Sequence, residues 1–169
     1  MLFLDNLSSL VRSGKENETE SWHPFQDWLL QLRRQGLAVA FVHHSGKNGL
    51  QRGTSGREDI LDTVIHLRSP KDYDPKQGCR FECHYEKARS FYGEDAMPFE
   101  AQLIMGVDLS VTWRVRGVEV AEIERVAVLL NEGCNQRTVA QMLGLSVGKI
   151  NRLSREAGRQ GLLKQPLKM

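Results

Sequence analysis

The strongest constraint on the fold is a pair of short apolar runs, each of which ends on polar residues of chemical interest. Residues 2–4 are apolar and Asp5 follows them, while the second run, residues 37–42, ends on His43-His44. Uninterrupted runs of this kind predict strands that are buried on both faces of a sheet. Between them, residues 22–34 place apolar side chains at three- and four-residue steps, which predicts a helix. Strand, helix and strand in this order predict a parallel crossover.

The next part of the chain has a strand pattern and then changes to a helical one. Further strands are predicted at residues 63–67, 80–87, 99–104 and 109–115. We expect the last two to pair as an antiparallel hairpin around Gly106 and Asp108. After Gly117 the spacing is helical, with helices predicted at residues 119–131, 136–143 and 147–158. The fold class is therefore α/β with a small all-α C-terminal domain, and the predicted domains are residues 1–116 and 117–169.

The charge of the chain is unevenly distributed. Residues 1–116 carry 15 Lys and Arg against 16 Asp and Glu, whereas residues 133–169 carry seven against a single acid, Glu156. Three cysteines without a signal peptide argue against a disulfide framework and for a reducing, cytoplasmic location. No apolar run approaches the roughly 20 residues that span a bilayer, so no membrane partner is expected.

Residues 136–153 fit the helix-turn-helix template. Ala140 allows close approach of two helices, Gly144 makes the turn and Ser146 caps the next helix. The exposed face of that helix then presents phosphate and base-edge donors for duplex DNA, namely Lys149, Asn151, Arg152, Arg155 and Arg159. The alternative is a three-helix packing module with solvated cations.

The carboxyl ends of the first two strands carry the candidate catalytic groups. Ligands bind at this edge of open parallel sheets, which points to Asp5 and to His43 or His44. The alternative for the histidines is one buried, hydrogen-bonded ring and one solvated ring. The following loop, residues 45–57, is rich in Gly and Ser and carries Lys47, Arg52 and Arg57, so its backbone can approach a phosphate. Its alternative is a mobile surface loop.

Two further groups lie in the predicted antiparallel strands. Lys87 and Arg89 are two residues apart in an extended segment, so both cations point to one side; the alternative is a solvated strand end. A zinc ion near His66 and His84 would need both Cys79 and Cys83 as ligands. In a strand these two cysteines are roughly 13 Å apart, too far to share one zinc ion at about 2.3 Å from each sulfur. Cys83 is better interpreted as a small core residue.

Taken in order, several motifs resemble a known family. They are Asp5-Asn6-Leu7-Ser8-Ser9-Leu10, His43-His44-Ser45-Gly46-Lys47, Arg52-Gly53-Thr54-Ser55 with Asp59 and Asp62, and Lys87-Ala88-Arg89 followed by Gly93. Over about residues 1–115, the chain resembles RecA-fold ATPases of the RepA/DnaB hexameric helicase group, and most of all the AAA-type RepA-like ATPases encoded with plasmid and phage replication genes.

The resemblance implies a RecA-like P-loop NTPase core that uses Mg-ATP in DNA replication. Asp5 would be the Walker B residue that holds Mg²⁺ through water, and His44 or His43 would be the sensor. The loop of residues 45–57 would contact single-stranded DNA. Lys87 and Arg89 would enter the nucleotide site of a neighbouring subunit, with Arg89 as the arginine finger, which implies a homo-oligomer such as a hexamer.

The chain also departs from this family. No G-x-x-x-x-G-K-[ST] phosphate loop occurs in the 169 residues, and the family's catalytic glutamate is missing. We therefore interpret the chain as the C-terminal half of such an ATPase, from a fragment, an alternative start or a decayed gene, which should not bind ATP tightly alone. The alternative function is a non-enzymatic DNA-binding regulator that uses the half-ATPase as an oligomerisation scaffold.

Overall fold

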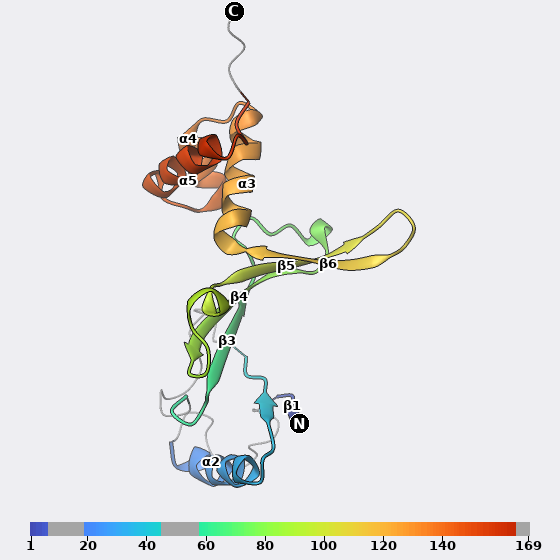
Figure 1. Cartoon of the computed structure of the whole chain (residues 1–169), viewed down its shortest axis with the longest axis vertical. Helices are drawn as coiled ribbons and strands as arrows, with labels where there is room; N and C mark the ends of the chain where they lie inside the picture. Colours follow the sequence, from blue (N-terminus) through green and yellow to red (C-terminus); the bar gives the residue numbers. More distant parts are fainter. Residues whose placement is uncertain (7–18, 45–57, 165–169) are drawn as a thin grey trace, which may run out of the picture. The chain divides into compact units, whose positions relative to one another are not determined.

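The computed structural model describes residues 1–6, 19–44 and 58–164, which belong to two compact units, residues 1–62 and 63–169 (Figure 1). Within the described residues there are four α-helices and two β-sheets, so the α/β class expected from the sequence is confirmed. The boundary predicted at 116/117 stays a prediction, because the division into compact units groups the second sheet with the helices that follow it.

The first unit pairs two short strands and packs one helix beside them. β1 (Leu2–Leu4) and β2 (Val39–Phe41) are parallel, as predicted, and α2 (Thr19–Arg34) connects them along the chain. Trp22 and Leu29 of α2 are buried and pack against apolar side chains of both strands. The helix ends before Gly36, whose φ of 78° is a left-handed conformation that glycine adopts without strain.

The second unit begins with a four-stranded antiparallel sheet. Its strands lie in chain order, β3 (Thr63–Arg68), β4 (Arg80–Ala88), β5 (Phe99–Met105) and β6 (Val111–Gly117). Short 3-10 turns, η2 (Pro75–Gln77) and η3 (Gly93–Ala96), lie in the β3–β4 and β4–β5 connections. β5 and β6 form the predicted hairpin, with Leu103 opposite Trp113.

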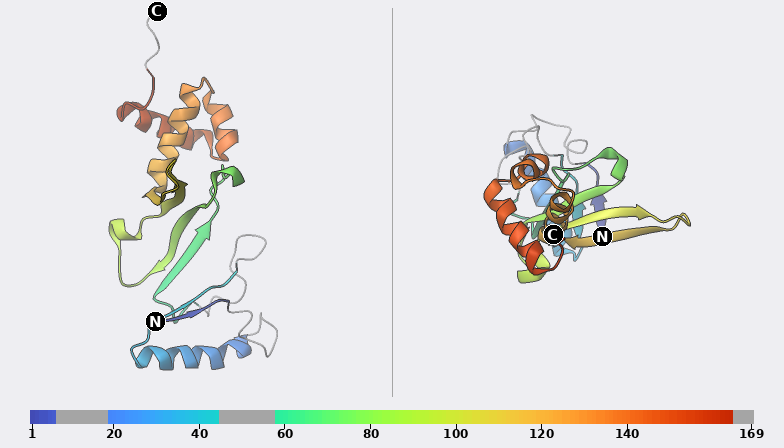
Figure 2. Two further views of the ribbon diagram at one scale, coloured as in Figure 1. Left: turned by 90° about the vertical axis from the view of Figure 1, so that its right-hand side faces the viewer. Right: turned by 90° about the horizontal axis from the view of Figure 1, so that it is seen from above.

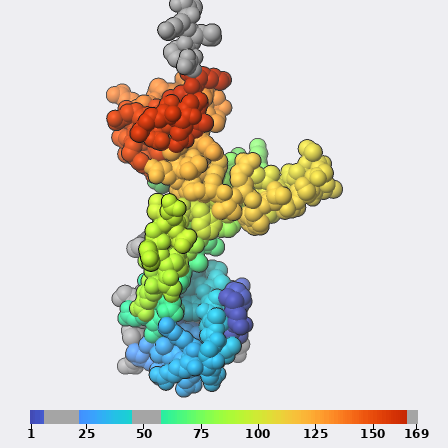
Figure 3. Space-filling model, in the orientation of Figure 1, coloured from blue at the N-terminus to red at the C-terminus, as the bar shows by residue number. Residues whose placement is uncertain are grey.

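Three helices complete the second unit. α3 (Val118–Asn131) continues directly from β6 and is followed by α4 (Gln136–Leu143) and α5 (Val147–Arg159). Figures 2 and 3 show these helices, in orange and red, grouped closely around one another. Their shared core consists of fully buried aliphatic side chains, among them Val126, Val139, Ile150 and Leu153. This core has more buried residues than the core of the first unit, so the three helices are the better-packed part of the described chain.

Candidate nucleic-acid interface

The α4–α5 pair is built by local sequence signals at both of its ends. The side chain of Asn135 accepts hydrogen bonds from the backbone N–H groups of Arg137 and Thr138, at 3.0 Å each, and so caps α4. Gly144 ends α4 with φ 61° and ψ 30°, a left-handed conformation that costs glycine little. Ser146 then caps α5 by accepting from the N–H of Lys149 at 3.2 Å. A three-residue turn therefore sets the angle between the two helices.

The turn is also tied to the sheet side of the unit. Lys71, in the β3–β4 connection, donates a hydrogen bond from Nζ to the carbonyl oxygen of Gly144 at 2.7 Å. A Cβ at position 144 would lie 3.0 Å from Cδ of Lys71, closer than ordinary van der Waals contact. Glycine at this position thus serves both the turn and the close approach of the Lys71 side chain.

Burial divides α5 into a core face and an outer face. Ile150, Leu153 and Ala157 are buried, and Ala140 of α4 is small enough for the two helices to pack closely. The opposite side of α5 is exposed to solvent. Its residues include Asn151, Arg152, Arg155 and Arg159. The predicted division of this helix into a core face and a polar face is therefore what the structure contains.

Most of the cations on α5 already have a carboxylate partner in the structure. Nζ of Lys149 lies 2.7 Å from Glu122 of α3, and Arg152 forms an ion pair with Glu119 of the same helix. Arg159 pairs with Glu156 one turn earlier at 3.0 Å. The Arg152–Glu119 and Arg159–Glu156 pairs are exposed and are each worth at most about 1 kcal/mol, so a phosphate can replace the carboxylate at little cost. The pair of Lys149 is more buried, because only 12% of the Glu122 side chain is exposed.

Arg155 differs from the other cations of this helix. Its Nε donates to Oδ1 of Asn151 at 3.0 Å, and Asn151 in turn donates from Nδ2 to Gln136 of α4 at 3.3 Å. Among the residues that the structure describes, no carboxylate pairs with Arg155. Its remaining guanidinium N–H groups are thus available to an external acceptor, while the relay through Asn151 orients the side chain.

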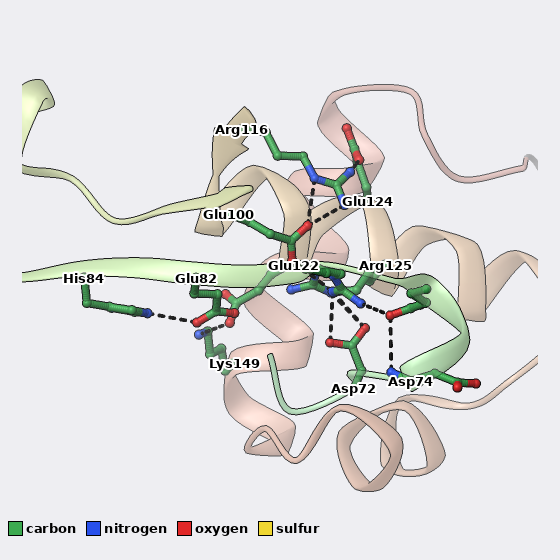
Figure 4. Close-up of polar contacts among 12 residues, drawn as sticks. Asp72, Asp74, Glu82, His84, Glu100, Arg116, Glu122, Glu124, Arg125 and Lys149 are labelled. Atoms are coloured by element: carbon green, nitrogen blue, oxygen red, sulfur yellow. Dashed lines mark hydrogen bonds and ion pairs between the residues drawn. The ribbon is translucent and has the colours of Figure 1, made fainter. Parts of the chain in front are cut away.

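A cluster of buried charges holds the sheet against α3 (Figure 4). Its centre is Glu100 of β5, which is 1% exposed. Glu100 accepts hydrogen bonds from three arginines: Arg80 of β4 at 2.9 Å, Arg116 of β6 at 2.8 Å and Arg125 of α3 at 2.5 Å. Three strands and a helix therefore meet at one carboxylate.

The arginines of this cluster have further acidic and polar partners. Arg80 donates to both carboxylate oxygens of Asp72, at 3.1 and 3.2 Å, and to Oε1 of Gln77 at 2.7 Å. Arg125 also lies 3.4 Å from Asp72, and Arg116 pairs with Glu124 of α3. The buried charges are thus compensated within the cluster, as buried charges must be.

The pKa values reflect this compensation. Burial alone raises the pKa of Glu100, but the hydrogen bonds from Arg80, Arg116 and Arg125 outweigh burial and lower the pKa from 4.5 to about 2. For Arg80, burial lowers the pKa, but Glu100 and Asp72 more than offset it and raise the pKa above its ordinary value. Glu100 and Arg80 therefore stay charged near neutral pH, so the cluster fixes the position of α3, and with it α4 and α5, on the sheet.

The sequence did not predict this cluster. Strand alternation places Arg80 on the polar face of β4, where a solvated side chain is expected, yet Arg80 is 6% exposed. The available signal was the presence of opposite charges, Arg80, Glu100 and Arg116, at polar-face positions of three successive strands. Only the register, with Glu100 directly opposite Arg116, shows that they meet.

In the first unit, the structure brings some of the predicted catalytic residues together. Asp5 and Asn6 follow β1, and His43 and His44 follow β2, so all four lie at the carboxyl ends of paired parallel strands. Nδ2 of Asn6 lies 3.1 Å from Nε2 of His44, a hydrogen bond between the two strand ends. Sequence reasoning singled out Asp5 and missed Asn6 as the residue that contacts the histidine.

The remaining predicted site residues are in two groups. Lys87 lies in β4 and Arg89 follows that strand, both in the second unit. The other group, Lys47, Arg52 and Arg57, lies outside the described residues, as does the loop of residues 45–57 that was assigned to single-stranded DNA.

The described parts of the chain show neither a metal centre nor a membrane span. No group of three or more His, Cys, Asp or Glu side chains is placed there to hold a metal ion. No helix in the described ranges is both long and apolar enough to cross a bilayer. Compared with known proteins, the chain matches no protein-family model, no curated protein and no solved structure. The resemblance to RepA-like and DnaB-like ATPases stays a prediction.

Proposed function

We propose that this chain binds duplex DNA, with α3, α4 and α5 acting as a helix-turn-helix domain whose last helix enters the major groove. The α4–α5 pair is the observation that carries the proposal. A left-handed Gly144 and a capping Ser146 join two helices whose inner faces are buried, while α5 turns cationic and amide side chains toward solvent. This is the arrangement in which helix-turn-helix proteins present a recognition helix.

The contacts on α5 support a division of roles among its polar side chains. Arg155 and Asn151 are exposed and linked to each other, and both types of side chain make bidentate contacts with base edges, Arg with guanine and Asn with adenine. Lys149, Arg152 and Arg159 are held by carboxylates of the protein itself. We assign these three to phosphates, which would replace the carboxylates on binding.

The test uses the full chain and a pool of duplex DNA, with binding followed by fluorescence anisotropy over a series of salt concentrations. Replacing Arg152 and Arg155 with Ala should weaken binding by roughly tenfold or more. It should also reduce the slope of log K against log salt by about 0.9 for each phosphate that the variant no longer neutralises. When preferred duplexes are selected from the pool, the variant should no longer discriminate between bases at the position that Arg155 contacts.

A matched control separates this interface from net charge. Arg34→Ala with Lys76→Ala removes two exposed cations outside α3–α5 and should leave affinity nearly unchanged. If the full chain shows no binding at low salt, or if the control pair weakens binding as much as the α5 pair, the proposal is wrong.

As a second candidate, we propose that residues 1–116 are the C-terminal part of a RecA-like ATPase domain of the RepA/DnaB group, acting in plasmid or phage DNA replication. The supporting observation is that β1 and β2 are parallel and that Asp5, Asn6 and His44 gather at their carboxyl ends. In the complete protein, Lys87 and Arg89 would serve a neighbouring subunit of a cytoplasmic homo-oligomer, and residues 45–57 would contact single-stranded DNA.

The residues of this chain do not by themselves fit Mg-ATP. The sequence contains no phosphate loop, and the described residues place no cluster of acidic or imidazole ligands around Asp5. We therefore expect no detectable binding of a fluorescent ATP analogue to the 169-residue chain at micromolar concentration. Tight, Mg²⁺-dependent binding would refute this interpretation.

Duplex binding by this chain does not distinguish an ATPase fragment from a regulator that uses its first unit only for oligomerisation. Because the chain has no phosphate loop, duplex binding should in both cases be independent of added ATP, and Asp5→Asn and His44→Ala should leave it intact. An in-frame G-x-x-x-x-G-K-[ST] motif upstream of Met1 in the genome would favour the ATPase instead.

A further inference from the structure

The four-stranded sheet has one polar and one apolar face, and the polar face carries the charged cluster that packs against α3. Strand register places Leu67, Cys83 and Phe99 side by side, and likewise Phe81, Ala101 and Val115. Ring contacts confirm that these positions share a face, since the ring centroids of Phe81 and Trp113 are 5.9 Å apart across β5. The charged cluster around Glu100 lies on the opposite face.

The apolar face is exposed to an unusual extent. Six of its large side chains are at least half exposed: Ile65 (53%), Leu67 (60%), Met105 (70%), Val111 (55%), Trp113 (52%) and Val115 (60%). In the described strands, the alternation brings one charge to this face, Lys87, which lies at the far end of β4. The other polar groups that these strands bring to it are the hydroxyl of Tyr85 and the thiol of Cys83.

The exposed area is large enough for an interface. Half-exposed side chains of this size each leave very roughly 100 Å² in water, so six of them leave on the order of 600 Å². That is the upper end of what a typical monomer exposes in one patch and approaches the roughly 800 Å² that each partner contributes to a standard interface. A covering partner must itself be apolar and uncharged at this position, and a second copy of the same face meets both conditions.

The β6 edge of the sheet is less suited to self-association than the apolar face. β6 is an edge strand, and antiparallel pairing of two copies about its centre would place Arg114 of one copy opposite Arg114 of the other. Like charges directly opposite each other destabilise a pair of strands. Charged side chains on edge strands are a common protection against such pairing. Association through the apolar face is therefore favoured over pairing through the β6 edge.

We propose that the apolar face of β3–β6 is a self-association surface, on which a second copy of this chain packs its own apolar face about a two-fold axis. The hairpin of β5 and β6 extends beyond the part of β4 that pairs with it, since β4 pairs with β5 only up to Gln102 (Figure 3). Met105, Val111 and Trp113 on that extension can therefore reach the partner without displacing β4. This proposal does not depend on DNA or nucleotide binding.

Sedimentation equilibrium of the full chain, from low to high micromolar concentration, tests the proposal. The wild-type chain should show a reversible monomer–dimer equilibrium, and Trp113→Arg and Val115→Asp should each raise the dissociation constant by at least about 30-fold, as expected at the centre of an interface. Both substitutions are at exposed positions, and circular dichroism should show an unchanged fold.

The matched control lies on the same strand but on the other face. Thr112→Arg adds the same charge as Trp113→Arg and should leave the dissociation constant within about threefold of wild type. A wild-type chain that stays monomeric throughout overturns the proposal. So does a dimer that survives Trp113→Arg and Val115→Asp, and so does a dimer that Thr112→Arg abolishes equally, because that result indicates edge pairing.

Discussion

Replacing Glu100 with Gln should strongly destabilise the second unit, although the two side chains are nearly the same size. The carboxylate is 1% exposed and accepts hydrogen bonds from three arginines, whereas a neutral amide can neither compensate their charge nor accept from all of them. The pKa of Glu100 falls from 4.5 to about 2 on folding, and a shift of that size corresponds to about 3 kcal/mol of unfolding free energy.

The same shift fixes how this stability depends on pH. Because the pKa of Glu100 is lower in the folded than in the unfolded chain, its contribution is complete above about pH 4.5 and is lost as the pH falls toward 2. Wild-type and Glu100→Gln chains should therefore differ by about 3 kcal/mol at pH 7. The difference should shrink steadily below pH 4.5.

Urea unfolding can be followed by hydrogen exchange of peptides from β5 and α3. This measures the unfolding free energy of the second unit separately from that of the first. Glu124→Gln is the matched control, since it removes an exposed carboxylate that also pairs with Arg116, and it should cost less than about 1 kcal/mol. A loss below about 1 kcal/mol for Glu100→Gln at pH 7 would refute the argument. A difference that stays constant down to pH 2 would refute it as well.

Three further predictions concern the turn between α4 and α5 and the cysteines. Gly144→Ala should lower the unfolding free energy by about 1–2 kcal/mol, because φ is 61° and the new Cβ meets Lys71; thermal unfolding measures this. Ser146→Ala should cost about 1 kcal/mol in the same assay, through loss of the α5 cap, and an unchanged midpoint would contradict the cap. With a maleimide near neutral pH, exposed Cys79 should react quickly. Cys83, whose thiol pKa is raised by burial, should react only after unfolding, as peptide mass spectrometry can show.

Local sequence signals predicted the elements of the fold well, because each depends on near neighbours along the chain. The strand–helix–strand order of the first unit and the hairpin around Gly106 were both predicted, and both are in the structure. Gly144 and Ser146 marked the turn of the candidate interface by their own conformational preferences. The exposed positions of Asn151 and Arg155 followed from helical periodicity.

Local sequence signals could not identify the ionic partners of the cations on α5. Periodicity placed Lys149 and Arg152 on the polar side of α5 but could not show that Glu122 and Glu119 of α3 hold them, because that depends on how two helices cross. The ATP-related roles of Asp5, His43, Lys87 and Arg89 remain predictions, since the described residues add only the contact between Asn6 and His44 to them.

The sequence by itself placed the strands and helices to within about three residues and identified the apolar faces of the second sheet and of the last three helices, since those properties depend on spacing within a single element. The expectation that the first two strands are buried on both faces was wrong, because only one helix of the described residues packs against them and Phe3 is 70% exposed. Tertiary structure alone decided that Arg80, Glu100, Arg116 and Arg125, far apart along the chain, share one buried site. It also decided that the apolar face of the sheet remains half exposed. Strand register and helix packing bring distant charges together and determine which apolar face is covered, and neither is encoded in the periodicity of one segment.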